Sequence, residues 1–391
     1  MSSAPLSLYL HVPFCDWKCT YCDFNSYAGL DDLIPAFVGA LEREIELWAP
    51  LASDRWVETV FFGGGTPSLL DVGQLARVME LVRRRFDVDA QAEVSLEANP
   101  GTVDLAKLRG FRETGINRLS FGIQSFDAGE LKFLTRIHDA DAARQAYVDA
   151  REARFDNINL DFIFGLPGQT AESWRATLDE ALSLGPEHLS LYILTVEENT
   201  PLGHDVARGL VREADPDLVA GLYTATEQHL AEAGYQQYEI SNWSLPGRQC
   251  RHNLTYWRNG EWLGLGPGAH SHFDGKRFAV VKSPQRYIKA MAADQGAFPF
   301  AVHEQVEEQS SDDEMADTAW LGLRLNEGLD LAGFEERFGL SFDDRFQGLA
   351  PRFTAQGLVS ELGGRLRLTE RGRLLSNEVF GALVSQDLEA V

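Results

Sequence analysis

The sequence predicts an α/β fold: a partial (β/α)6 barrel followed by a small, mainly helical C-terminal domain. The first observation is that strand-like apolar runs alternate six times with helical periodicity over the first 235 residues. The second is that glycine-rich and polar motifs come directly after these runs. In a parallel barrel the carboxyl ends of the strands carry the functional groups, so the two observations agree.

The elements follow in a regular order along the chain. Strands are expected over 6–12, 57–62, 92–97, 117–123, 157–164 and 187–194. Helices are expected over 31–49, 72–87, 103–114, 139–154, 171–184 and 217–234, and in the last part of the chain over 312–326, 330–338 and 342–357. The last helices precede a short hairpin pattern and a final helix, which is typical of a winged-helix-like module. We therefore expect a barrel at 1–235, a barrel-flanking extension at 236–305 and a C-terminal domain at 306–391.

The composition favours a globular protein and disfavours a membrane-spanning or nucleic-acid-binding one. The 391 residues are 44% hydrophobic, and no run of about 18 apolar residues is present, so a globular chain without a transmembrane helix is expected. The N-terminus lacks a basic region followed by an apolar core, which favours a cytoplasmic protein. The net charge of −24 disfavours nucleic acid as a partner, because such a surface repels phosphates. A homodimer and peripheral contact with a membrane stay open.

Three of the four cysteines lie within eight residues. Cys15, Cys19 and Cys22 have C-x3-C-x2-C spacing and follow the first predicted strand. Thiolates hold [4Fe–4S] clusters, and three of them leave one iron without a protein ligand. A structural zinc site is the alternative, and it needs a fourth ligand, for which His11 and Cys250 are candidates.

A glycine-rich turn and a carboxylate follow the next two strands. Gly64, Gly65 and Thr66 belong to Gly-Gly-Gly-Thr-Pro after the second strand. Glycines allow a sharp turn and a close approach of the backbone to a ligand, although a plain tight turn has the same composition. Glu97 ends the third strand, where a carboxylate suits ribose hydroxyls; a turn or capping role is the alternative.

Further polar side chains lie at the ends of the later strands. Gln124 ends the fourth strand, Asp161 lies in the fifth, and Arg136 and His138 lie between them. Each alone is more often a buried polar group with satisfied hydrogen bonds. Together they predict a ring of polar groups at the strand ends, where a barrel binds its ligand; the resemblance given below implies an adenosyl group there.

A second informative stretch is Cys250 to Trp257, which contains His252, Asn253, Tyr256 and Trp257. A histidine among aromatic residues offers haem an axial imidazole and flat faces for the macrocycle. A lone histidine near aromatic residues is more often structural, and Cys250 is more often a buried thiol. The motif is therefore a candidate haem site.

The cysteine motif, with an aromatic residue before its last cysteine, resembles that of the radical S-adenosylmethionine (SAM) superfamily. Gly-Gly-Gly-Thr-Pro, Glu-Ala-Asn-Pro, Gly-Ile-Gln-Ser and Asp-Phe-Ile-Phe-Gly-Leu-Pro-Gly-Gln-Thr narrow the resemblance to the oxygen-independent coproporphyrinogen III oxidase-like family. It implies a [4Fe–4S] cluster that binds SAM, with Tyr9, Gly64 and Glu97 at positions that contact this SAM. In the decarboxylase of that family a second SAM is contacted at positions matched here by Tyr21, Gly65, Thr66, Gln124, Arg136 and Asp161.

Two features favour one branch of the family. Phe24 stands where the decarboxylase has a fourth cysteine, and the first cysteine is residue 15, which leaves no room for the decarboxylase's N-terminal extension. His-Asn-x-x-Tyr-Trp resembles the signature of the haem chaperone (HemW) branch. That resemblance implies haem as cargo and haemoproteins as clients. The alternative is radical decarboxylation of coproporphyrinogen III, so whether the protein is an enzyme, and whether SAM is cleaved, stays open.

Overall fold

The computed structural model describes residues 4–293 and 296–385 and divides the chain into two compact units. The first, here called the barrel unit, comprises Met1–Gly234 and Glu261–Glu307. The second, here called the C-terminal unit, comprises Tyr235–Gly260 and Glu308–Val391. The stretch expected as a barrel-flanking extension thus contributes residues to both units, and the division into three domains stays a prediction.

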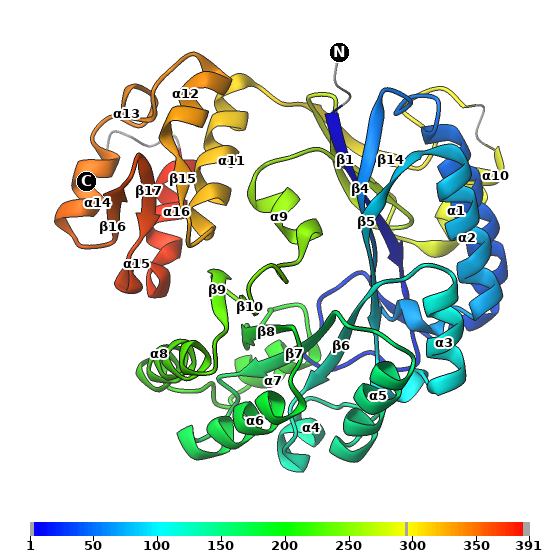
Figure 1. The fold of residues 1–391 in the computed structure, drawn as a ribbon, viewed down its shortest axis with the longest axis horizontal. Coiled ribbons are helices and arrows are strands. Elements are labelled where there is room, and N and C mark those ends of the chain that lie inside the picture. The colour runs from blue at the N-terminus through cyan, green and yellow to red at the C-terminus, as the bar shows by residue number, and fades with distance from the viewer. Residues whose placement is uncertain (1–3, 294–295, 386–391) are drawn as a thin grey trace. The chain divides into compact units, whose positions relative to one another are not determined.

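Six parallel strands form the barrel, in the order in which the sequence predicts them. They are β1 (Ala4–Val12), β4 (Arg55–Gly64), β5 (Asp87–Ala98), β6 (Arg118–Gln124), β7 (Ile158–Phe164) and β8 (His188–Ile193). The predicted helices are α1 (Ile34–Trp48), α2 (Val72–Arg85), α3 (Leu105–Glu113), α5 (Ala140–Glu152), α6 (Ala171–Leu184) and α8 (Pro216–Glu232). Figure 1 shows α1, α2, α3, α5 and α6 on the outer face of the curved sheet. The predicted partial (β/α)6 barrel is confirmed.

Alternation along β1 explains how this strand divides the two faces of the sheet. Leu6, Leu8 and Leu10 are fully buried, whereas Ser7 projects to the opposite face, because successive side chains of a strand alternate. The Thr59 hydroxyl of β4 donates to the Ser7 hydroxyl at 2.8 Å. One face of the sheet is therefore apolar, and the other has paired polar groups.

Several elements of the barrel unit are absent from the prediction. β11 (Trp262–Leu265) pairs in parallel with β1, and β12 (His270–Phe273), β13 (Lys276–Val280) and β14 (His303–Glu308) extend the sheet beyond it. The other unpredicted elements are β2 (Phe14–Cys15), β3 (Tyr27–Ala28), α4 (Ala128–Phe133), α7 (Pro201–Ala207), α10 (Pro284–Ala293) and the 3-10 helices Pro67–Leu69 and Pro100–Thr102; the helix expected from residue 31 begins with a 3-10 turn at Asp31–Leu33. β2 and β3 pair in parallel and bracket the cysteine loop.

The C-terminal unit contains the helices expected at 312–326 and 330–338 and the hairpin. The single helix expected over 342–357 is wrong, because Gly348, with a φ of 76°, separates two shorter helices. The helices of this unit are α9 (Arg251–Trp257), α11 (Ser311–Arg324), α12 (Leu331–Phe338), α13 (Phe342–Arg345), α14 (Leu349–Ala355), α15 (Glu370–Leu374) and α16 (Ser376–Val384). Its strands are β9 (Gln236–Glu239), β10 (Asn242–Ser244), β15 (Leu329–Asp330), β16 (Val359–Leu362) and β17 (Arg365–Leu368). β16 and β17 form the predicted hairpin. Phe334, Phe342, Phe346 and Phe353 belong to its apolar core, so this part has a core of its own.

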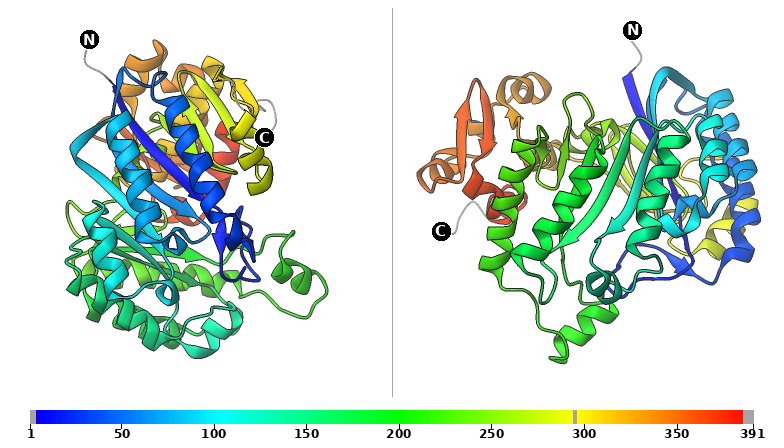
Figure 2. Two further views of the ribbon diagram at one scale, coloured as in Figure 1. Left: turned by 90° about the vertical axis from the view of Figure 1, so that its right-hand side faces the viewer. Right: turned by 60° about the horizontal axis from the view of Figure 1, so that its bottom comes forward.

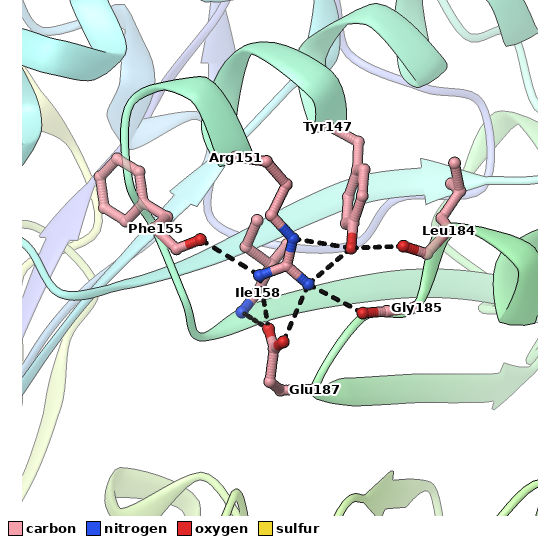
Figure 3. Close-up of polar contacts among 7 residues, drawn as sticks. All are labelled: Tyr147, Arg151, Phe155, Ile158, Leu184, Gly185 and Glu187. Atoms are coloured by element: carbon pink, nitrogen blue, oxygen red, sulfur yellow. Dashed lines mark hydrogen bonds and ion pairs between the residues drawn. The ribbon is translucent and has the colours of Figure 1, made fainter.

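Figure 2 shows the helices and strands of the barrel unit from two further sides. A hydrogen-bonded arginine, Arg151, ties α5 to the segments just before β7 and β8 (Figure 3). The Arg151 guanidinium binds both carboxylate oxygens of Glu187 at 2.9 Å. It also donates to the carbonyl of Phe155 at 3.1 Å, and the Tyr147 hydroxyl donates to the carbonyl of Leu184 at 2.7 Å. These groups lie at the amino ends of the strands, where a barrel is stabilised and catalytic groups are not placed.

We expect Arg151→Met to destabilise the barrel unit by about 2 kcal/mol, because it removes the charged partner of the partly buried Glu187 carboxylate and the donor to the Phe155 carbonyl. Glu187 then keeps the N–H of Ile158 as a donor. The matched control is Arg109→Met, which breaks an ion pair to Glu152 whose side chains are 55% and 56% exposed. Its cost should stay below about 1 kcal/mol. Denaturant midpoints of the cluster-free proteins measure both, and equal costs would contradict the structural role of Arg151.

Candidate functional site

The barrel unit contains a cavity of about 530 Å³ at the carboxyl ends of its strands. Its walls include most of the residues that the sequence singled out: Cys15, Cys19, Tyr21, Cys22, Gly64, Gly65, Thr66, Glu97, Gln124, Arg136 and Asp161. The cysteine loop after β1, the glycine turn after β4 and the ends of β5, β6 and β7 all meet here. The structure therefore brings these residues together in one place.

The three cysteines face this cavity as free thiols. The Thr66 hydroxyl donates to Cys15 Sγ at 3.5 Å, and the Arg136 guanidinium donates to Cys19 Sγ at 3.5 Å. Burial raises the pKa of the Cys15 thiol, and the hydrogen bond from Thr66 acts against that rise. Across residues 4–293 and 296–385, no three His, Cys, Asp or Glu side chains gather around the position of a single ion. A cube does not require that, since each thiolate binds a different iron, and the donor set fits a cluster.

A zinc site at the three cysteines would need a fourth ligand, for which His11 and Cys250 are the candidates. A hydrogen bond of 2.9 Å joins His11 Nε2 to the carbonyl of Asn25, and one of 3.1 Å joins His11 Nδ1 to the Tyr9 hydroxyl. Both ring nitrogens of His11 thus have partners, and burial lowers its pKa. Cys250 lies at the start of α9 in the C-terminal unit. Tyr9 itself stacks on Phe61 and does not belong to the described cavity wall.

The glycine turn fits closely around the cysteine loop. A side chain at Gly65 would place its Cβ 2.6 Å from the carbonyl oxygen of Phe14 and 3.0 Å from Cys15 Sγ. Gly64 has a φ of 118°, which side chains disfavour, and its N–H donates to a Glu97 carboxylate oxygen at 3.0 Å. Gly65 is therefore required by the close packing and Gly64 by its backbone conformation, as in any tight turn of this kind; contact of the turn with a ligand stays a prediction.

Two buried carboxyl groups lie in the cavity wall. Burial, together with the nearby Asp161 carboxyl, raises the pKa of Glu97 to about 8. Burial also raises the pKa of Asp161, against hydrogen bonds from the Ser120 hydroxyl at 2.9 Å and the Asn159 amide at 2.8 Å. Such a pair favours a ligand that brings hydroxyl or ammonium donors to it.

We expect Glu97→Gln to stabilise the cluster-free protein more at pH 9 than at pH 6. Between the ordinary value of 4.5 and the folded value of about 8, the folded state keeps a proton that the unfolded state releases. Stability is therefore lost as pH rises through this window, and glutamine removes the loss, by on the order of 2 kcal/mol between the two pH values. Denaturant midpoints of both proteins measure it; a gap that does not grow with pH would contradict the raised pKa.

Arg136 and His138 make hydrogen bonds to the backbone at the carboxyl end of β6. The Arg136 guanidinium donates to the carbonyl of Gly122 at 2.7 Å, and Gln124 has a φ of 72° at an irregularity of the β6–β7 pairing. Hydrogen bonds of 3.1 Å join the His138 ring to Asn99 Oδ1 and to the carbonyl of Ile123. Burial lowers the pKa of His138 to about 4. His138 thus braces the turn, and Arg136 reaches the sulfur of the cysteine loop.

The same cavity wall has an apolar part that the sequence did not predict, although Phe24 in it was singled out for another reason. Trp17 is 57% exposed and Phe24 is 65% exposed, and both flank the cysteines; Tyr192 and Ile193 at the end of β8 are also exposed. The Lys18 ammonium donates to the carbonyl of Phe24 at 2.9 Å and shapes this loop. Aromatic residues on both sides of the cysteines were the available signal, since exposed aromatic side chains mark ligand or partner contacts.

The haem candidates lie on α9 in the C-terminal unit. His252 is buried, and a 2.8 Å hydrogen bond joins its Nε2 to the Tyr256 hydroxyl one turn later. The Arg324 guanidinium lies 4.3 Å from the centre of the Trp257 ring. Asn253 is partly exposed on the same helix. The structure thus brings His252 and Tyr256 into contact, and it pairs Trp257 with a residue that the sequence did not indicate.

Within the described part of the chain, the helices are all too short or too polar to cross a membrane.

Comparisons with known proteins agree with this architecture. The radical SAM superfamily model matches residues 9–181, and the model of the HemN C-terminal domain matches residues 309–375. The chain is 36% identical over 382 residues to a protein of Bacillus subtilis named heme chaperone HemW, covering 97% of this chain and 99% of the relative. A Mycobacterium tuberculosis protein of the same name is 39% identical over 387 residues, covering 98% of this chain and 96% of the relative.

A solved structure extends the comparison to the fold. Coproporphyrinogen III oxidase (HemN) from Escherichia coli, described as a radical SAM enzyme, superposes with a TM-score of 0.84 at 27% identity. The match covers 98% of this chain and 91% of that one. The chain belongs to the radical SAM superfamily and, within it, to the family of the heme chaperone HemW proteins.

Proposed function

We propose that this protein is a haem chaperone, which binds haem, transfers it to client haemoproteins and carries a SAM-binding [4Fe–4S] cluster. The observation that carries the proposal is the 36–39% identity, over nearly the whole chain, to relatives named heme chaperone HemW. Phe24 supports it, since an exposed aromatic side chain stands in the cavity wall where the decarboxylase motif has a further cysteine. We further propose that the protein acts in the cytoplasm, with homodimer formation and peripheral membrane contact left to experiment.

The barrel cavity is the proposed cluster and SAM site. Cys15, Cys19 and Cys22 would hold three irons, and the cluster would supply an open iron for the methionine part of SAM and an electron. The backbone at Gly64 would approach the ligand, while Glu97 would accept hydrogen bonds from it. The chain's own contribution is thus to bind and orient SAM between buried polar groups.

The haem site is proposed on α9, with His252 as axial ligand. Its Nε2 is engaged by Tyr256 in this structure, so the hydrogen bond has to open before that nitrogen binds iron. The test is a titration of haem into the reconstituted protein and into His252→Ala, followed by the absorption spectrum. Wild type should bind haem stoichiometrically with an imidazole-ligated spectrum, which the variant should lose; undiminished binding with the same spectrum would remove His252 as ligand.

We expect Tyr256→Phe to tighten haem binding roughly threefold to tenfold, because the variant lacks the hydroxyl that competes with iron for His252. Tyr27→Phe is the matched control, since it removes the same hydroxyl from a tyrosine of the barrel unit, where that hydroxyl donates to Asn25 Oδ1 at 3.0 Å. Its affinity should equal that of wild type. Weaker binding by Tyr256→Phe would show that the hydroxyl supports the ligand instead of competing with it.

Radical decarboxylation of coproporphyrinogen III is the second candidate function. The TM-score of 0.84 to the Escherichia coli oxidase favours it, together with the shared cavity motifs. The test is anaerobic incubation of the reconstituted protein with coproporphyrinogen III, SAM and a reductant, followed by chromatography of the porphyrins. The chaperone proposal expects no protoporphyrinogen, and its formation at catalytic turnover would replace that proposal.

A further inference from the structure

Two buried hydrogen-bond donors lie next to each other in the C-terminal unit. Within the residues that the structure describes, neither Trp257 Nε1 nor Arg324 Nε has an acceptor, although both atoms are buried. The two side chains are in contact, with the guanidinium 4.3 Å from the centre of the indole ring. A buried donor without an acceptor is costly, so a pair of them in one contact indicates a place where a ligand supplies the acceptor.

The positive charge of Arg324 favours an anionic acceptor for these two donors. The Arg324 side chain is 22% exposed, and one terminal nitrogen binds the buried Glu239 carboxylate at 3.2 Å. Glu239 also accepts from the N–H of Ser241 at 3.0 Å and from the amide of Asn242. Glu239 therefore binds only one terminal nitrogen of the guanidinium, and among the described residues Nε is left without an acceptor. The edge of a guanidinium that includes Nε binds a carboxylate well, because two parallel N–H groups can donate to its two oxygens.

Hydrogen bonds join the end of α9, the helix that carries Trp257, to α11, the helix that carries Arg324. The Asn259 amide, just after α9, donates to Glu314 at 2.9 Å and to the Thr318 hydroxyl at 3.1 Å, and both partners belong to α11. Arg324 is the last residue of that same α11. The two donors are thus mounted on two helices that are tied together, which makes the spacing between them a property of the fold.

We propose that Trp257 and Arg324 form a carboxylate subsite, which binds one propionate group of haem through the indole N–H and the guanidinium. The inference rests on the proposed function, because it takes haem as the ligand of α9. Haem is an apolar disc with two carboxylates at one edge, and a cationic group at that edge complements a histidine at the iron. Arg324 is a binding residue in this account, and it lies outside the His-Asn-x-x-Tyr-Trp motif.

The experiment compares haem with its dimethyl ester, in which both carboxylates are blocked, at the same low detergent concentration. Wild type should bind haem roughly 10- to 100-fold more tightly than the ester, the range expected for hydrogen bonds to a charged group. Arg324→Met should bind the two ligands with nearly equal affinity. Trp257→Phe, which keeps a ring but removes the N–H, should lose part of the discrimination, and Arg324→Lys should also be intermediate.

The control is Arg258→Met, which removes the same charge from the residue beside Trp257. Arg258 pairs with Glu327 at 3.2 Å, and the two side chains are 58% and 46% exposed, so its loss should leave the discrimination unchanged. Equal affinity of wild type for haem and ester, or full discrimination by Arg324→Met, would overturn the subsite. If folded wild type binds neither haem nor the ester, the proposed function is overturned. If Arg324→Met still shows the imidazole-ligated spectrum of haem, haem binding at α9 holds and only the carboxylate subsite is under test.

Discussion

Cys19→Ser is expected to lose the iron–sulfur cluster after anaerobic reconstitution. Cys19 lines the barrel cavity with the two other cysteines of the loop, and serine offers iron a much poorer ligand than thiolate. Loss of a direct ligand should exceed the roughly 10- to 100-fold cost of losing an outer partner of a metal site. Iron and sulfide content and the cluster's visible absorption measure the effect.

Cys250→Ser is the matched control for this prediction. Cys250 is fully buried at the start of α9 in the C-terminal unit, and the proposed cluster does not use it. Its iron content should equal that of wild type. A loss of iron in Cys250→Ser equal to that in Cys19→Ser would assign Cys250 to the metal site and would revive the zinc interpretation, as would zinc in place of iron and sulfide in wild type.

Gly65→Ala is expected to have the second-largest effect. The added Cβ would meet the carbonyl oxygen of Phe14 at 2.6 Å and Cys15 Sγ at 3.0 Å, so the cysteine loop has to shift. Because binding sites tolerate displacements of well under 1 Å, SAM affinity should fall by roughly 100-fold. Equilibrium dialysis with SAM on the reconstituted protein measures it, alongside iron content.

Gly221→Ala controls for the loss of a glycine as such. Gly221 lies in α8, and a Cβ there has nothing within 4 Å, so alanine should leave SAM binding unchanged and stabilise the helix by about 0.5–1 kcal/mol. Wild-type SAM affinity in Gly65→Ala would mean that the glycine turn does not position the ligand.

The barrel was predictable because its strands are long and each is followed by a helix. The expected strand 57–62 is the centre of β4, Arg55–Gly64, and the expected helix 171–184 is α6 without change. β11 to β13 escaped prediction because they are short and lie next to glycine-containing turns, and β14 (His303–Glu308) because five of its six residues are polar. The pairing of β11 with β1 joins segments far apart in the chain, and local patterns do not encode it.

The candidate site was predictable for a related reason. Gly64, Glu97 and Asp161 are distant in sequence, but parallel strands bring their carboxyl ends to one edge, so motifs at strand ends meet. Exposure of Tyr192 was not predictable, because it depends on what covers the end of β8. The contact of Arg324 with Trp257 depends on how α9 and α11 pack, which no spacing in the sequence contains.

Transfer of bound haem tests the central claim most directly. Haem-loaded protein is mixed with increasing concentrations of apo-haemoproteins from the same organism, and the spectrum of the acceptor is followed. A chaperone hands haem over in a complex, so for a true client the rate should rise with acceptor concentration and exceed the rate of spontaneous dissociation. A rate that stays at the dissociation rate for every acceptor, whatever its concentration, would contradict the account.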